Sequence, residues 1–383
     1  MAYIFTAPKR TVMGENALSA CEAYMKQYGT KAMIVSGKHV TKAGMVKTLT
    51  DSLDAWGIAH ALFNDIPGEP TVEMIEAGVR AYRDAKCDFI IAIGGGSPLD
   101  SAKAIAAMSV LKGKIPDYMG KEITGEFPPM VMIPTTAGTG SEATKFTIIT
   151  DTETDVKMLL KGEALLPDLA VVDAAYTVSS PPSITASTGM DALTHAVESY
   201  ISKRANAMTD MYALSAIKKI FANLPKAYAD GSDMAARTEM AAAAYQAGLC
   251  INNASVTLVH GMSRPIGALF HVPHGISNAM LISACMAYVK DGCEAKFADM
   301  AKAIGAADER AADSAAANAF LEALAKLTKT LEIPTLAEYG IDPERFAALA
   351  DKMAGDAMTS GSPQNCIRSV EKSDLLKIYS SLW

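Results

Sequence analysis

Short apolar segments alternate with helical patterns through the first half of the chain, and no other feature restricts the fold as strongly. Nearly continuous apolar strands separated by helices are typical of a parallel sheet that helices cover on both faces. The expected strands are 31–37, 60–66, 89–96 and 131–136, and the expected helices lie near 13–28, 40–56, 71–86 and 98–111. Two further apolar segments, 145–151 and 169–174, are expected to add strands to this sheet.

The character of the sequence changes at a segment rich in Pro, Ser and Thr, residues 179–188. Beyond it, segments rich in Ala and Met follow a 3.6-residue period to the end of the chain, and the strand signals fade. A length of 383 residues also favours two domains over one. We therefore predict an α/β domain with a mostly parallel sheet over 1–180 and an all-helical domain over 181–383.

Charge and cysteine usage exclude several classes of protein. The net charge of −7 argues against a nucleic-acid or membrane partner, and no apolar run approaches the ~18 residues that span a bilayer. The first ten residues, MAYIFTAPKR, lack the pattern of a signal peptide. The six cysteines show no CxxC spacing, which favours reduced thiols over a disulfide framework. We expect a soluble, cytoplasmic protein.

Two glycine-rich turns follow predicted strands. Residues 94–98 read GGGSP and open a helix, with Ser97 expected as its N-cap and Pro98 in its first turn. Residues 133–142 read IPTTAGTGSE and carry four hydroxyl groups. Neither turn is a Walker A or GxGxxG motif, and either alone is equally typical of an ordinary tight turn. Two such turns at the carboxyl ends of parallel strands favour dinucleotide binding.

Histidines concentrate in the helical half of the chain. Asp191 and His195 are four residues apart, so both lie on one stripe of a helix that should be buried. Downstream, residues 259–275 read VHGMSRPIGALFHVPHG and contain His260, His271 and His274. Each histidine alone is usually a hydrogen-bonded core residue. Together, one carboxylate and three or four imidazoles suit a divalent ion such as Fe²⁺ or Zn²⁺.

The motifs at 94–103 (GGGSPLDSAK), 134–142 (PTTAGTGSE), 189–200 (GMDALTHAVESY) and 260–275 (HGMSRPIGALFHVPHG) occur together and in this order. In this respect the sequence resembles the iron-containing (group III) alcohol dehydrogenases along essentially its whole length. The resemblance implies a dehydroquinate synthase-like fold, with a dinucleotide-binding domain, a helical metal domain and an active site in the cleft between them. It also implies a homodimer.

Residue by residue, the resemblance carries a metal site and a cofactor site onto this chain. The implied metal ligands are Asp191, His195, His260 and His274. The implied cofactor-binding residues, which include a pyrophosphate loop, are Gly94, Gly95, Gly96, Ser97, Asp100, Thr135, Thr136, Thr139 and Lys157. Glu198, one turn after His195, is interpreted either as a carboxylate supporting the metal ligands or as an exposed helix residue.

The sequence departs from the family pattern at two positions. Relatives that prefer NAD carry an Asp where this chain has Gly37, followed by Lys38. Because an Asp there would repel a 2′-phosphate and a Lys would attract it, we predict that NADP(H) is preferred over NAD(H). Arg264 stands where many relatives have a histidine that relays protons. Arginine is a poor general acid, so His271 becomes the candidate relay, with bulk water or a packing role as the alternatives.

The resemblance implies hydride transfer between NAD(P)H and a metal-bound carbonyl carbon. Ile251, Phe146 and Cys366 match positions that line the substrate pocket in relatives, and their apolar character favours a small aliphatic aldehyde or alcohol, or a short diol. The expected ion is Fe²⁺, with Zn²⁺ as the alternative. The alternative functions are a glycerol dehydrogenase-like zinc enzyme and a non-catalytic scaffold that retains the fold.

Overall fold

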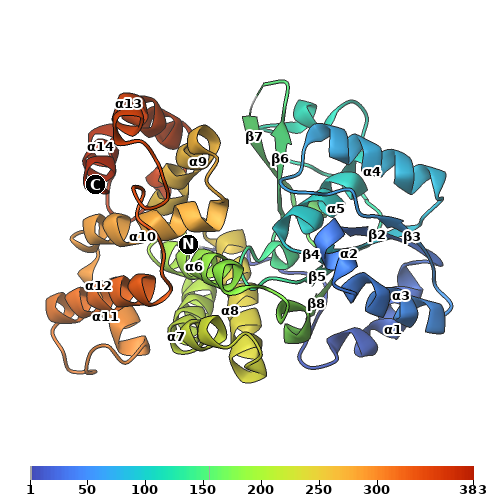
Figure 1. Ribbon diagram of the computed structural model, residues 1–383, viewed down its shortest axis with the longest axis horizontal. Helices are drawn as coiled ribbons and strands as arrows, with labels where there is room; N and C mark the ends of the chain where they lie inside the picture. The colour runs from blue at the N-terminus through green and yellow to red at the C-terminus, as the bar shows by residue number, and fades with distance from the viewer. Residues whose placement is uncertain (1, 155) are drawn as a thin grey trace. The chain divides into compact units, whose positions relative to one another are not determined.

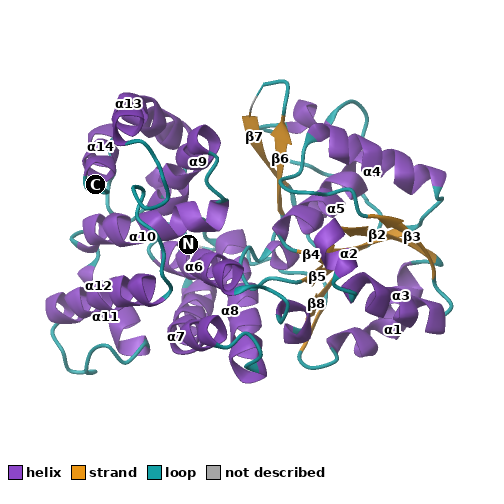
Figure 2. Ribbon diagram, viewed as in Figure 1, coloured by secondary structure: helices purple, strands orange, loops and turns teal. Residues whose placement is uncertain are grey.

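The computed structural model describes residues 2–154 and 156–383, and the chain forms two compact units. One unit is Thr6–Ser180, and the other is Pro181–Trp383 together with the start of the chain through Phe5. The strands all belong to the first unit, whereas helices make up the second (Figures 1 and 2). No helix among the described residues is both long enough and apolar enough to cross a bilayer.

The first unit is built on a parallel sheet with the strand order β1-β8-β5-β4-β2-β3. Every pairing within this sheet is parallel. Its strands are β1 (Thr11–Met13), β2 (Lys31–Ser36), β3 (Ala59–Phe63), β4 (Phe89–Gly94), β5 (Met130–Pro134) and β8 (Leu169–Val172). The predicted α/β class is therefore confirmed, and β1 is a short edge strand that the sequence pattern misses.

Helices cover both faces of this sheet. They are α1 (Glu22–Tyr28), α2 (Lys38–Lys42), α3 (Met45–Ala55), α4 (Val72–Asp84) and α5 (Gly96–Met108). Along β2, Met33 and Val35 join the apolar cluster formed with α4 and α5, whereas Ala32 and Ile34 join the cluster formed with α1 and α3. Successive strand residues thus pack in opposite apolar clusters, which explains why these strands read as continuous apolar runs. Figure 1 shows the helices on both sides of the sheet.

The prediction that 145–151 adds a strand to the main sheet is wrong. That segment forms β6 (Phe146–Asp151), which pairs antiparallel with β7 (Val156–Lys161) in a separate two-stranded sheet. Buried and less buried residues alternate along both strands, so each strand has a single buried face. Such a strand does not suit the centre of a sheet that is covered on both sides.

The second unit is helical, as predicted. Its α-helices are α6 (Pro182–Tyr200), α7 (Ala207–Ala229), α8 (Met234–Asn253), α9 (Leu258–Phe270), α10 (His274–Lys290), α11 (Glu294–Ala303), α12 (Asp313–Thr330), α13 (Pro343–Thr359) and α14 (Lys372–Ser380). Helix α6 packs against α7, α8 and α10 and is buried on nearly all sides. A polar residue on α6 therefore needs a partner inside the unit.

Candidate metal centre

Two of the four implied metal ligands lie on α6. Asp191 and His195 are one helical turn apart, and their residues are only 2% and 4% exposed. Burying a carboxylate and an imidazole side by side is costly unless both find partners. The distance from Asp191 Oδ1 to His195 Nε2 is 3.8 Å, too long for a hydrogen bond between them.

The other two implied ligands come from α9 and α10. His260 lies in the first turn of α9, and His274 is the first residue of α10. A tight turn joins these helices because His271, the C-cap residue that follows α9, adopts a left-handed conformation with φ of 54°. That turn brings two histidines fourteen positions apart in sequence onto neighbouring helices.

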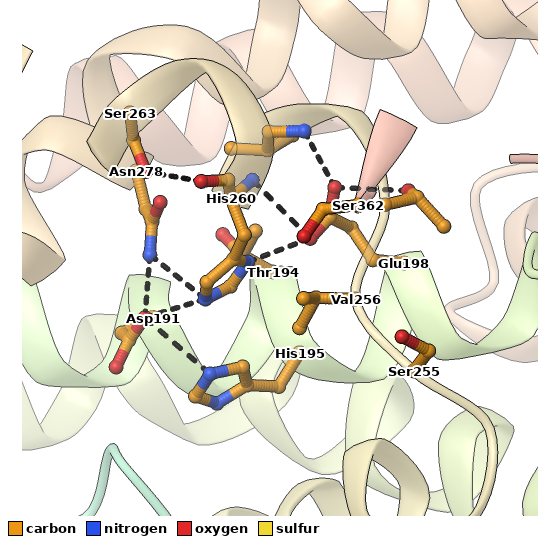
Figure 3. A network of polar contacts seen from close by, with 12 residues as sticks. Asp191, Thr194, His195, Glu198, Ser255, Val256, His260, Ser263, Asn278 and Ser362 are labelled. Carbon is orange, nitrogen blue, oxygen red and sulfur yellow. Dashed lines mark hydrogen bonds and ion pairs between the residues drawn. The ribbon is translucent and has the colours of Figure 1, made fainter. Parts of the chain in front are cut away.

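The four side chains converge. One ligand atom from each of Asp191, His195, His260 and His274 lies within 4.8 Å of all the others. Asp191 Oδ1 is 3.6 Å from Nε2 of His260 and 3.6 Å from Nε2 of His274. Figure 3 shows Asp191, His195 and His260 directed toward one another from α6 and α9. The predicted group of four is thus brought together in space.

The donor set fits a divalent metal ion. A tetrahedral ion with bonds near 2.1 Å requires ligand atoms about 3.4 Å apart, close to the separations seen around Asp191. One carboxylate and three imidazoles are ligands that suit Fe²⁺ or Zn²⁺. The side chain of His274 is 37% exposed, whereas those of His195 and His260 are 6% and 3% exposed. Access to the centre is therefore on the His274 side.

Glu198 supports His260 from behind. The residue is fully buried, so the alternative that it is an exposed helix residue is wrong. Its Oε2 lies 2.6 Å from Nδ1 of His260, and its Oε1 accepts hydrogen bonds from the hydroxyl of Thr257 and the backbone N–H of Val259. With Nδ1–H donating to the carboxylate, Nε2 of His260 keeps its lone pair directed at the other ligands.

The charges of the cluster stabilise one another. Burial raises the pKa of Asp191, but the surrounding imidazoles more than offset this and hold that pKa well below its usual value. Burial likewise raises the pKa of Glu198, but His260 and hydrogen bonds from Thr257 together hold that pKa below its usual value. Both carboxylates are therefore anionic at neutral pH, which is the form that a cation requires.

Asn278 also reaches the centre, and sequence analysis missed it. Its Nδ2 lies 2.7 Å from Asp191 Oδ1, 3.1 Å from His260 Nε2 and 3.2 Å from His274 Nε2. The sequence signal was available, since Asn278 follows His274 by four residues on α10. The same spacing relates Asp191 to His195 on α6, so a search for polar pairs at this spacing finds both.

His271, the candidate proton relay, and Arg264, which replaces the family's relay histidine, lie near the ligands in sequence but are not among them. His271 is exposed in the turn between α9 and α10. Arg264, one turn after His260 on α9, donates a hydrogen bond from Nη1 to the hydroxyl of Ser362 at 3.0 Å. Of the pocket residues suggested by the resemblance, Cys366 is fully buried in this unit.

In the α/β unit, the two glycine-rich turns lie side by side. They follow β4 and β5, which are neighbours paired at Gly94 and Pro134. The backbone N–H of Thr135 donates to the carbonyl of Gly94 at 2.8 Å. A Cβ atom on Gly96 would lie 2.8 Å from Cγ2 of Thr139, so any other residue here would force Thr139 to shift. The two turns therefore meet at the carboxyl edge of the sheet.

The helix after the first turn begins earlier than predicted. Gly95, not Ser97, is the N-cap of α5, and Pro98 still lies in the first turn, where its missing N–H costs nothing. A glycine cap leaves the first backbone N–H groups without a side chain bonded to them, which suits an anion at this helix start.

The turn after β2 flanks the same edge of the sheet. The chain passes from β2 outward to β3 and then returns to β4 on the other side of β2, so the direction of winding reverses between β2 and β4. Ligands of open α/β sheets bind at such a reversal. Gly37, which caps α2, and Lys38 follow β2 at this point. Lys38 pairs with Asp65 at 3.0 Å on the surface.

Three implied cofactor residues have partners in the protein. Both oxygens of Asp100 accept hydrogen bonds, one from the hydroxyl of Ser141 at 2.6 Å and one from the backbone N–H of Ile148 at 2.9 Å. Lys157 pairs with Glu69 at 2.7 Å. Thr139 accepts from the backbone N–H of Ser141 at 3.3 Å. Asp100 thus ties α5 to the segment that follows the second turn.

A buried lysine binds the segment that follows the second turn. Lys103 is fully buried on α5 and donates to the carbonyl of Thr144 at 2.7 Å and the carbonyl of Phe146 at 2.8 Å. Glu142, also buried, and Asp100 supply the compensating negative charge. Sequence analysis did not single out Lys103 or Glu142, although both lie inside the quoted motifs.

Comparison with known families agrees with this geometry. Residues 8–174 match the family described as iron-containing alcohol dehydrogenase, and residues 185–383 match the C-terminal part of the Fe-containing alcohol dehydrogenase family. The chain belongs to the iron-containing alcohol dehydrogenase family. This membership places it among the alcohol dehydrogenase class of oxidoreductases and confirms the resemblance seen in its motifs.

Individual relatives match over most of their length. The chain is 37% identical over 340 residues to a choline dehydrogenase of Bacillus subtilis (strain 168), covering 88% of this chain and 85% of the relative. It is 35% identical over 379 residues to the lactaldehyde reductase of Escherichia coli (strain K12), covering 97% of each. A solved 1,3-propanediol oxidoreductase matches the whole of both chains with a TM-score of 0.96 at 34% identity. The two-part fold is thus that of the family.

Proposed function

We propose that this protein is a metal-dependent alcohol dehydrogenase or aldehyde reductase that transfers hydride between NAD(P)H and a small aliphatic aldehyde or alcohol, short diols included. The observation that carries the proposal is the convergence of Asp191, His195, His260 and His274 inside a buried helical unit. A scaffold without catalytic function has no reason to retain four such buried polar groups. Similarity to relatives named lactaldehyde reductase and 1,3-propanediol oxidoreductase supports the same substrate class.

The protein's own residues hold and orient the ion. Asp191 and the three histidines would bind Fe²⁺, with Zn²⁺ as the alternative, since Zn²⁺ binds such ligands more tightly in the general affinity series. Glu198 fixes the tautomer of His260, so that its Nε2 stays a ligand. When bound, a divalent ion polarises a carbonyl oxygen in reduction and lowers the pKa of an alcohol in oxidation.

The cofactor is proposed to bind at the carboxyl edge of the parallel sheet. Gly94, Gly95, Gly96 and Ser97 start α5, where free N–H groups suit a pyrophosphate. NADP(H) is proposed as the preferred cofactor because no acidic side chain stands at Gly37. Lys38 is available to a 2′-phosphate, because its pairing with Asp65 joins two largely exposed side chains and is worth little.

His271 is proposed to relay protons between the site and solvent. Its ring is exposed in the turn that links the helices of His260 and His274. Arg264 cannot take this role, because a guanidinium keeps its proton at any pH of interest. Replacing His271 with Ala should change the pH–rate profile, and an unchanged profile would remove His271 from the mechanism.

The substrate and the cofactor are best tested together. Protein reconstituted with Fe²⁺ or with Zn²⁺ is mixed with NADPH and a panel of small aldehydes, and consumption of NADPH is followed. The proposal expects turnover that the His260→Ala variant lacks, while quenching of NADPH fluorescence persists in that variant. Bound metal with no turnover across the panel would instead favour a non-catalytic scaffold.

Oligomeric state and location follow from the family proposal. We propose a homodimer, as the family resemblance implies, and a cytoplasmic location. All six cysteines are free thiols, and five of them are buried. Burial raises the pKa of the Cys250 thiol and, to about 11, that of Cys21, which leaves both unreactive.

A further inference from the structure

Asn278 contacts three of the four proposed metal ligands, although an amide nitrogen is not itself a metal ligand. The residue is 0% exposed and lies one turn into α10, after His274. Asparagine is a poor residue for a helix interior, because its side chain competes with backbone hydrogen bonds. The contacts of its side chain should therefore explain why asparagine occupies this position.

Those contacts fix which way the amide faces. Nδ2 of Asn278 donates to Asp191 Oδ1 at 2.7 Å, the shortest of its contacts (Figure 3). Turning the amide over would place its oxygen at that distance from the carboxylate oxygen, and two acceptors so close repel each other. Oδ1 of Asn278 is buried without a hydrogen-bond partner among the described residues. The donor end alone therefore determines the orientation.

Asp191 depends on this donor. Its Oδ1 is the atom that lies 3.6 Å from the nitrogens of His260 and His274, and it is the atom that Asn278 contacts. A carboxylate can rotate about its terminal bond, so a fixed N–H donor on one oxygen holds that oxygen in place. The N–H of Asn278 can satisfy one lone pair of Oδ1 and leave another for a cation.

We propose that Asn278 is a positioning residue that holds Oδ1 of Asp191 at the metal centre and so sets the affinity of the site for its ion. The inference rests on the proposed function, because it presumes that the four residues bind a metal. Partners that orient metal ligands typically change metal affinity by roughly 10- to 100-fold when they are removed. Asn278 would do for Asp191 what Glu198 does for His260.

Two substitutions distinguish the effect of the N–H donor from the effect of the side-chain volume. Asn278→Ala removes both the donor and the volume, whereas Asn278→Leu removes the donor but keeps a branched side chain of similar size. If the amide only fills space, the Leu variant binds metal like the wild type. If the donor holds Asp191, both variants lose affinity. Asn223→Ala is the matched control, because that amide donates to the backbone carbonyl of Lys219 on α7, at 2.9 Å, and lies on a helix that carries none of the four ligands.

The experiment titrates metal-free protein with Co²⁺ in the presence of a competing chelator and records the absorption spectrum of the bound ion. The wild type and Asn223→Ala should bind Co²⁺ with the same affinity and the same spectrum. Both Asn278 variants should bind at least about tenfold more weakly and show altered bands. Wild-type affinity in either Asn278 variant would overturn the inference. Absence of Co²⁺ binding by the wild type would instead overturn the proposed function.

Discussion

Nδ1 of His260 lies 2.6 Å from Oε2 of Glu198, and both side chains are buried in the helical unit. The carboxylate also receives N–H and O–H donors from the start of α9, so it fixes the helix and the ring together. Which nitrogen of His260 can face a metal is thus decided by a residue that the metal does not touch.

Glu198→Gln tests this relationship. The glutamine amide has the same shape as the carboxylate, but its NH₂ group is a donor and would face groups that already donate. His260 would therefore lose the acceptor that fixes its tautomer. We expect metal affinity to fall by roughly 10- to 100-fold and stability to fall by about 1–3 kcal/mol. Chelator competition and urea unfolding measure the two effects. Glu142→Gln, a buried carboxylate in the other unit, is the control and should leave metal affinity unchanged. If both variants bind metal equally well, Glu198 has no supporting role.

Two neighbouring glycines allow packing to be separated from ligand binding. A Cβ atom on Gly96 would lie 2.8 Å from Thr139, whereas one on Gly95 would lie 3.6 Å from Thr136, an ordinary contact. Gly96→Ala should therefore destabilise the protein by about 1–3 kcal/mol, and Gly95→Ala by less than about 1 kcal/mol.

Gly95→Ala should nevertheless weaken NADPH binding by about tenfold, because a methyl group at the start of α5 obstructs a phosphate. Thermal unfolding and NADPH fluorescence quenching distinguish the two effects. Wild-type NADPH affinity in Gly95→Ala would show that this turn does not hold the phosphates.

Cofactor preference should respond to Gly37. The backbone there has φ of −102°, which any residue adopts, and a new Cβ atom would lie 3.2 Å from the carbonyl of Ile66, so Asp fits with a small shift. Gly37→Asp should move the ratio of kcat/KM toward NADH, and Lys38→Ala should lower kcat/KM for NADPH alone. A wild-type enzyme that clearly prefers NADH would refute the proposed NADP(H) preference.

The stability of the α/β unit should depend on the protonation of Glu142. Burial raises the pKa of this residue from 4.5 to about 7. A raised carboxyl pKa means that the folded state binds a proton which the unfolded state has released, so stability falls as pH rises from about 4.5 to 7. Glu142→Gln should remove this pH-dependent loss of stability, which is on the order of 3 kcal/mol. The measurement is urea unfolding of metal-free protein at a series of pH values. Identical pH dependence in the two proteins would contradict the expectation.

Sequence patterns predicted those parts of the site whose residues recur at a regular spacing. Asp191 and His195 are one turn apart on a helix whose burial was foreseeable, and the glycine turns follow strands of unmistakable apolar character. Strand β6 was misplaced because its apolar residues do not alternate strictly in the sequence, although burial alternates along the strand and its partner is β7 in a separate sheet. Spacing along the helices could single out Asn278, four residues after His274, and did single out Glu198, one turn after His195. Their partners Asp191 and His260 lie on other helices, so no local pattern could name those contacts.

The central claim is that Asp191, His195, His260 and His274 bind one catalytic ion. The direct measurement is the metal content of purified, reconstituted protein, wild type against Asp191→Ala, with NADPH affinity measured on the same samples. We predict about one Fe²⁺ or Zn²⁺ per wild-type chain, with loss of the metal and of turnover in Asp191→Ala but nearly unchanged NADPH affinity. A variant that retains the ion and its activity would contradict the account.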